Sequence, residues 1–177
     1  MLTAIATLDT VLAAHESVIG RDFTAYRNHT YRVANLCVAQ SSDAPEPLEK
    51  IAIATAFHDL GIWTDHTFDY LPPSVALARS YLEQSGRLDW VPEVSEMIFE
   101  HHKITPYKGR RDWLVEAFRR SDWTDVTRGV LRYGLSRSLV RQILATWPDA
   151  GFHKMLVRLE LTRLRTHPLN PLPMMRL

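Results

Sequence analysis

The apolar residues of the chain recur three and four positions apart, the spacing of one face of an α-helix. No stretch keeps the period-two alternation of a half-buried strand. The pattern therefore predicts an all-α fold, with a polar, proline-containing break over 41–47 and a non-helical tail over 167–177. The expected helices cover residues 2–19, 23–40, 48–60, 75–84, 92–102, 112–124, 137–147 and 151–166.

Several helix ends carry residues with a structural preference for that place. Gly61 is expected to cap the third helix, because glycine tolerates the left-handed conformation that ends helices. Ser74 and Ser136 are expected as N-caps, since a hydroxyl can accept from a free backbone N–H. Pro92 suits the first position of a helix, where no N–H is needed.

Composition and charge narrow the classes of protein. The 177 residues, 46% of them hydrophobic, suit one domain over 1–177 with one core. With 21 Lys and Arg against 20 Asp and Glu, no overall field favours DNA, RNA or an anionic membrane. Cys37 is the only cysteine, which excludes an internal disulfide and leads us to expect a cytoplasmic protein. No segment approaches the roughly 20 apolar residues of a membrane span.

Four predicted helices carry polar side chains on their apolar faces. Burying a polar group without a partner costs on the order of 2 kcal/mol, so such positions need an explanation. Each apolar stripe, continued by the helical spacing, includes polar residues. These are His29 in the helix over 23–40, His58 and Asp59 in the helix over 48–60, His101 with its neighbour His102 in the helix over 92–102, and Asp122 in the helix over 112–124.

Any one of these residues, taken alone, fits a hydrogen-bonded core position or a cap. Together, two histidines and two aspartates from three helices supply nitrogen and oxygen donors that suit a divalent ion. The positive charge of the ion would also make the burial of two carboxylates tolerable. The set His29, His58, Asp59 and Asp122 therefore predicts a metal site.

Three stretches carry a family resemblance: YRNHTYRV, IATAFHDLGIW and FRRSDWTDV, which span Tyr26–Val126. They resemble the ordered signature of the HD superfamily of metal-dependent phosphohydrolases, a histidine, a His-Asp pair and a distant aspartate. The resemblance implies a compact HD-domain bundle of about seven helices, with further helices and the tail over 136–177. It also implies that His29, His58, Asp59 and Asp122 are the metal ligands.

Two-metal members of this superfamily carry additional histidines between the pair and the last aspartate. The stretch EHHKITPY supplies His101 and His102, but residues 71–74, where such members have another histidine, read LPPS. We therefore expect one firmly held ion, with His101 and His102 forming a second site or facing a phosphate. The donors accept Mn, Fe, Co, Ni, Zn or Mg.

The resemblance implies hydrolysis of a small phosphate ester, with a nucleotide as the leading candidate. Asp59 would orient or deprotonate a water, while His101 and His102 would protonate the leaving oxygen. The expected contacts of the phosphorylated substrate are Arg32, Lys103, Asp65 and His66.

Three other functions remain open at this point. An HD-type module could bind metal and ligand without turnover, and a helical adaptor could use the inward polar residues only for hydrogen bonds. An HD-type oxygenase would use two irons in a similar ligand set. The amphipathic first and last helices are also compatible with a homodimer.

Overall fold

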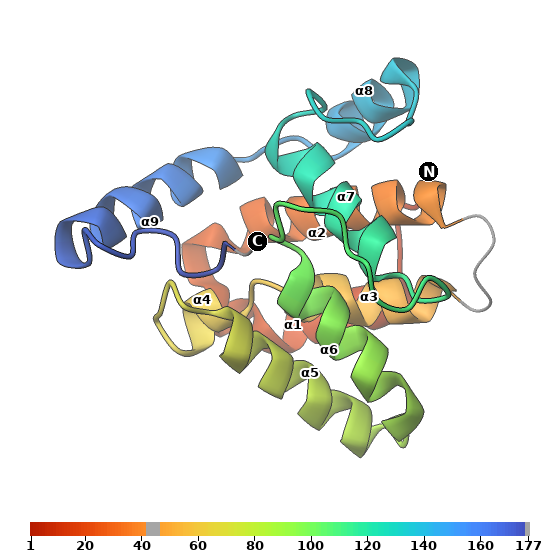
Figure 1. Ribbon diagram of the computed structural model, residues 1–177, viewed down its shortest axis with the longest axis horizontal. Helices are drawn as coiled ribbons and strands as arrows, with labels where there is room; N and C mark the ends of the chain where they lie inside the picture. Colours follow the sequence, from red (N-terminus) through yellow and green to blue (C-terminus); the bar gives the residue numbers. More distant parts are fainter. Residues whose placement is uncertain (42–46, 176–177) are drawn as a thin grey trace.

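The computed structural model describes residues 1–41 and 47–175 and is all-α there, as predicted (Figure 1). Two 3-10 turns, Gly20–Asp22 and Leu88–Trp90, join helices. Within the described ranges, no helix has the length and apolar character needed to cross a membrane. The helices are α1 (Ala6–Ile19), α2 (Phe23–Gln40), α3 (Pro47–Phe57), α4 (Gly61–Thr64), α5 (Leu71–Gln84), α6 (Val91–Glu100), α7 (Val115–Val126), α8 (Arg137–Thr146) and α9 (Phe152–Thr166).

Helices α2 and α3 lie at the centre of the bundle. Helix α2 packs against α3, α7 and α8, and α3 packs against α1 and α6. Helix α6 also packs against α5 and α7. Figure 1 shows α9 extending away from this body, with the chain after it turning back towards the centre. Residues that directly follow the carboxyl ends of α3 and α6 contact residues of α2 and α7.

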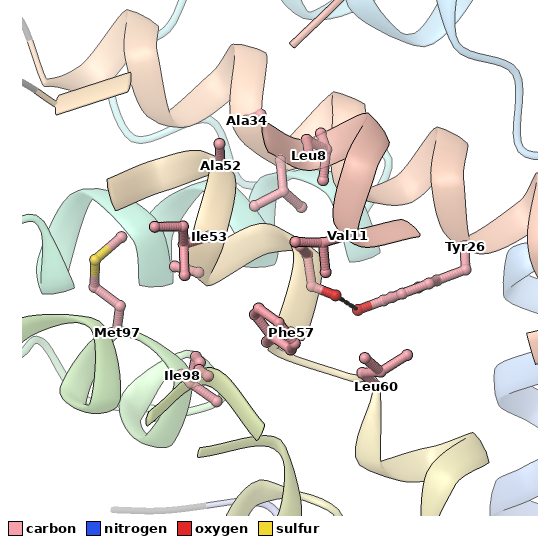
Figure 2. Close-up of a cluster of buried hydrophobic side chains, with 14 of the residues drawn as sticks. Leu8, Val11, Tyr26, Ala34, Ala52, Ile53, Phe57, Leu60, Met97 and Ile98 are labelled. Atoms are coloured by element: carbon pink, nitrogen blue, oxygen red, sulfur yellow. Dashed lines mark hydrogen bonds between the residues drawn. The ribbon is translucent and has the colours of Figure 1, made fainter. Parts of the chain in front are cut away.

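The core between these helices is built from the predicted apolar stripes (Figure 2). Each buried side chain of the size of leucine contributes about 1.5–3 kcal/mol to folding. The Tyr26 hydroxyl is satisfied inside this core, because it donates to the Ala56 carbonyl over 2.9 Å. The buried members drawn include Leu8, Val11, Ile53, Phe57, Leu60, Met97 and Ile98.

One of the predicted helix starts is confirmed, and another shifts by one residue. Ser136 caps α8, and its Oγ accepts from the Leu139 N–H over 3.2 Å. Helix α6 begins at Val91 and not at Pro92, which still lies in the first turn, where its missing N–H costs nothing.

The expectations for Gly61 and Ser74 were wrong. Gly61 does not cap α3 but begins α4, and α5 starts at Leu71, three residues before Ser74. Ser74 instead accepts the Gly61 N–H on its Oγ over 3.0 Å. A Cβ on Gly61 would lie only 2.6 Å from the Tyr70 carbonyl oxygen, so glycine is needed here for close packing.

Other boundaries shift by a few residues. Helix α1 begins at Ala6 instead of Leu2, and α7 begins at Val115 instead of Asp112. Helix α6 ends at Glu100, which leaves the histidine doublet in the following turn. Of the predicted break, residues 42–46 lie outside the described residues; residues 167–175 of the tail are non-helical, as expected, and 176–177 are again outside.

Candidate metal centre

Six polar side chains from four parts of the fold converge at the centre of the bundle. Helix α2 brings one histidine, the turn after α3 brings the His-Asp pair, the turn after α6 brings the doublet, and α7 brings the last aspartate. All but one are buried, and the side chain of the sixth, His102, is 16% exposed. This His–Asp cluster consists of His29, His58, Asp59, His101, His102 and Asp122.

The Asp59 carboxylate lies between two pairs of histidines. Its Oδ2 is 3.3 Å from His58 Nε2 and 3.6 Å from His29 Nε2. Its Oδ1 faces the other way and lies 3.4 Å from His101 Nε2. Each oxygen of this carboxylate therefore faces a different pair.

Asp122 is placed in the same way from the opposite side. Its Oδ1 is 3.5 Å from His29 Nε2, and its Oδ2 is 3.5 Å from His102 Nδ1. The cluster contains two sets of three residues, and within each set the ligand atoms lie within 4.8 Å of one another. Asp59 belongs to both sets. The cluster thus offers two neighbouring places for a cation, and the two sets are His29, His58 and Asp59, and Asp59, His101 and His102.

Among the residues that the structure describes, three buried polar atoms of the cluster find no hydrogen-bond partner: Asp59 Oδ1, His101 Nε2 and Asp122 Oδ2. Such atoms are costly in a protein interior, and most have partners. All three face the interior of the cluster, and a bound divalent cation would satisfy them together. The donor set therefore fits a metal ion, and ligation by these particular residues stays a prediction.

Burial and mutual charge perturb the acids and bases of the cluster. Burial lowers the pKa of His58 to about 3, and its histidine neighbours add to this, so its ring is neutral and able to bind a cation. Burial also raises the pKa of Asp122 to about 6. His101 behaves differently: burial opposes protonation, but Asp59 and the charge of Asp122 raise the pKa of its ring above the usual value.

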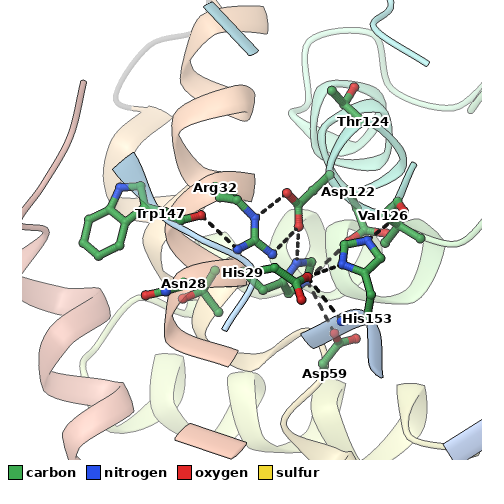
Figure 3. A network of polar contacts seen from close by, with 12 residues as sticks. Asn28, His29, Arg32, Asp59, Asp122, Thr124, Val126, Trp147 and His153 are labelled. Atoms are coloured by element: carbon green, nitrogen blue, oxygen red, sulfur yellow. Dashed lines mark hydrogen bonds and ion pairs between the residues drawn. The ribbon is translucent and has the colours of Figure 1, made fainter. Parts of the chain in front are cut away.

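A buried carboxylate that the sequence analysis missed supports His29. Asp125 Oδ2 accepts from His29 Nδ1 over 2.7 Å, while Arg32 donates to both Asp125 oxygens, from Nε over 2.5 Å and from Nη2 over 2.9 Å. Figure 3 shows the Arg32 guanidinium beside this network. Although burial opposes it, the contacts with His29 and Arg32 lower the pKa of Asp125, which keeps it ionised. His29 is thereby oriented with Nε2 towards the cluster.

The comparison with protein families agrees with this arrangement. The family model described as the HD domain matches residues 26–145, about two thirds of the chain. The chain belongs to the HD-domain family. Comparisons with curated proteins and with solved structures gave no match.

In this HD domain Arg32 is not the expected phosphate contact. Its side chain is 1% exposed, and besides binding Asp125 it donates from Nη1 to the Trp147 carbonyl over 3.2 Å and the Pro148 carbonyl over 3.3 Å. Arg32 points inwards from α2, but its partner there is a buried carboxylate. Arg32 therefore ties α7 and the α8–α9 connection to α2.

The other expected substrate contacts lie next to the His–Asp cluster in sequence or away from it in the structure. Lys103 follows His102, and its Nζ is 3.8 Å from Glu100 Oε2. Asp65 is exposed and accepts from the Thr64 hydroxyl. His66 lines a hollow of about 560 Å³ whose lining includes no residue of the His–Asp cluster. The structure does not bring Asp65 and His66 to the site, whereas contact of Lys103 with a substrate stays a prediction.

Tyr70 is a second neighbour of the cluster that the sequence analysis did not place there. It is 2% exposed, and its Oη lies 2.6 Å from His102 Nε2. It immediately precedes residues 71–74, where a further histidine was sought. The HD domain thus has a phenol at the edge of the second set of ligand atoms.

Proposed function

We propose that this protein is a metal-dependent phosphohydrolase that cleaves a small phosphate ester, with nucleotides as the first substrates to test. Membership of the HD-domain family gives the general class, and the His–Asp cluster supplies the chemistry. The observation that carries the proposal is the set of three unpartnered buried atoms that face one another across the cluster.

We further propose that the cluster holds two ions and not only one. His29 and His58 would bind the first ion, and His101 and His102 the second. Asp59 and Asp122 would bridge them, because each carboxylate directs one oxygen to either side. The sequence favoured a single ion because no histidine stands at 71–74, and the geometry supports the second more strongly than the motif did.

When bound, such ions supply an acidified water and positive charge for the phosphoryl oxygens. With only the first ion bound, Asp59 Oδ1, which has no hydrogen-bond partner among the described residues, would accept a proton from a water on that side of the cluster. His102 is the most exposed member, so the substrate would approach on its side. Without a second ion, the contacts of His101 with Asp59 and Asp122 favour its protonated form, which could donate to the leaving oxygen; with a second ion, His101 would be a ligand.

Phosphate release tests this function directly. Chelated protein would be resupplied in turn with Mn, Co, Ni, Fe or Mg and offered a panel of nucleoside monophosphates and an aryl phosphate. We expect release that depends on the metal and disappears in Asp59→Ala. His15→Ala is the matched control, because His15 bonds to the Val11 carbonyl in α1 and should leave release unchanged.

A di-iron oxygenase is the second candidate. It is favoured by the same four histidines and by the Asp59 carboxylate that the two sets of ligand atoms share, because these donors also suit two irons. Dioxygen consumption by iron-loaded protein, without phosphate release from any ester, would favour it. Stoichiometric metal without either reaction would indicate an HD-type binding module.

A further inference from the structure

The four histidines of the His–Asp cluster share one arrangement: one ring nitrogen faces the cluster and an oxygen outside it contacts the other. For three of them the outer nitrogen is Nδ1. The contacts are 2.7 Å from His29 to the Asp125 carboxylate, 2.8 Å from His58 to the Thr55 carbonyl and 2.6 Å from His101 to the Ile98 carbonyl.

Those three oxygens can only accept a hydrogen bond. Carbonyl groups have no proton to give, and the Asp125 carboxylate already accepts from Arg32 on both oxygens. In its neutral form, each ring must therefore carry its proton on Nδ1. Each Nε2 then has the lone pair that binds a cation.

His102 is arranged the other way round and has a different kind of neighbour. Its Nδ1 faces Asp122 Oδ2 at 3.5 Å, and its Nε2 is 2.6 Å from Tyr70 Oη. A hydroxyl can either donate or accept. Only when Tyr70 accepts does Nε2 carry the proton and Nδ1 keep the lone pair that a metal ion needs.

Backbone contacts fix the position of Tyr70. The Tyr70 carbonyl accepts from the Ser74 N–H over 3.0 Å, and the Ser74 hydroxyl accepts from the Gly61 N–H. Because a Cβ at Gly61 would lie 2.6 Å from that same Tyr70 carbonyl, the backbones at Gly61 and Tyr70 are in close contact. These contacts fix the backbone of Tyr70, whose Oη lies against His102.

We propose that Tyr70 is a positioning residue for the second metal ion. Its hydroxyl accepts the Nε2 proton of His102 and so presents Nδ1 as a ligand, beside His101 Nε2 and the outer oxygens of Asp59 and Asp122. Because the hydroxyl can turn, His102 is the one ligand whose tautomer is not fixed by an obligatory acceptor. The second ion should therefore bind more weakly than the first and dissociate first. This inference rests on the proposed metal-dependent function.

Titration of the chelated full-length protein with Mn²⁺, followed by calorimetry, tests the proposal. The wild-type protein should bind two ions in two steps. Tyr70→Phe removes only the hydroxyl and should weaken the second step about 10–100-fold, the usual loss when an outer hydrogen bond to a ligand is removed. The first step should not change.

Tyr26→Phe is the matched control. Tyr26 is equally buried beside the cluster, but its hydroxyl donates to the Ala56 carbonyl and not to a histidine nitrogen. Both binding steps should stay as in the wild type. In a His102→Ala background, Tyr70→Phe should have no further effect on metal binding, a result that a general structural role of Tyr70 would not give.

The failure of this inference can be told apart from failure of the proposed function. Two wild-type steps with an unchanged second step in Tyr70→Phe would overturn the role of Tyr70 alone. A single step in the wild type would also overturn it while leaving a one-metal hydrolase. No binding at all would overturn both. If Tyr70→Phe alone failed to fold, as judged by its helical circular dichroism, the substitution would be compared in folded His102→Ala protein. An effect of Tyr70→Phe on metal binding there would refute the proposal.

Discussion

Asp125 Oδ2 lies 2.7 Å from Nδ1 of His29, on the side of the imidazole that faces away from the His–Asp cluster. The same carboxylate binds the guanidinium of Arg32, so a single buried acid orients a candidate metal ligand and neutralises a buried cation. Removing its charge should therefore affect two separate properties, the stability of the fold and the affinity for metal.

Asp125→Asn should lower the free energy of unfolding of the metal-free protein by about 3–5 kcal/mol, because it leaves Arg32 buried without a counter-charge. Urea denaturation would measure this. Asp112→Asn is the control: it breaks a similar two-bond contact with Arg110 at the surface and should change stability far less. A stability of Asp125→Asn within 1 kcal/mol of the wild type, as an order-of-magnitude limit, would refute this account of Arg32.

Asp125→Asn should also weaken the binding of the first metal ion about 10–100-fold, because His29 loses the charged acceptor that holds its tautomer. The second ion should be affected less, since its histidines have other partners. Competition with a chromophoric chelator at a temperature where the variant is folded would measure both affinities. Equal losses at both steps would show that Asp125 acts on the fold as a whole.

Gly61→Ala should destabilise the protein by about 1–3 kcal/mol, the usual cost of forcing an extra carbon into a packed interior. The added Cβ would meet the Tyr70 carbonyl at 2.6 Å and the Pro73 side chain at 2.9 Å. Thermal unfolding would report the loss. An unchanged melting temperature would mean that α4 and α5 can separate without cost.

Cys37 predicts a fall in stability at alkaline pH. Burial raises the pKa of its thiol well above the usual range, so above about pH 8.5 the unfolded chain loses a proton that the folded chain keeps. The contribution is complete below that pH and is lost as pH rises, by about 1 kcal/mol between pH 8.5 and 9.5. Denaturation curves of the wild type and Cys37→Ala would show whether the decline is smaller without the thiol; equal slopes would contradict it.

The helical periodicity was sufficient to predict the architecture and the inward direction of the cluster residues. His29, His101 and Asp122 each share a stripe with fully buried apolar neighbours, such as Val33, Met97 and Phe118. A polar side chain on such a stripe must face the interior, wherever the helix packs. The exception is Leu48, an apolar residue at the N-terminal end of α3 that is 39% exposed.

What periodicity lacks is the identity of the partner across the bundle. Arg32 stands three residues after His29 and also points inwards, but its partner Asp125 lies 93 residues away in sequence. The spacing of Asp125, three residues after Asp122 on the same helix, was the available signal for it. Tyr70 gave no comparable signal, because its place depends on how the irregular segment after the His-Asp pair folds onto Gly61.

Anomalous diffraction from crystals of protein loaded with Mn²⁺ would test most directly whether the His–Asp cluster is a metal centre. We expect two peaks, one bounded by His29 and His58 and one by His101 and His102, with Asp59 and Asp122 between them. Both peaks should disappear in Asp59→Ala crystals grown under the same conditions. Manganese-saturated crystals with no anomalous peak among these six residues would contradict the account.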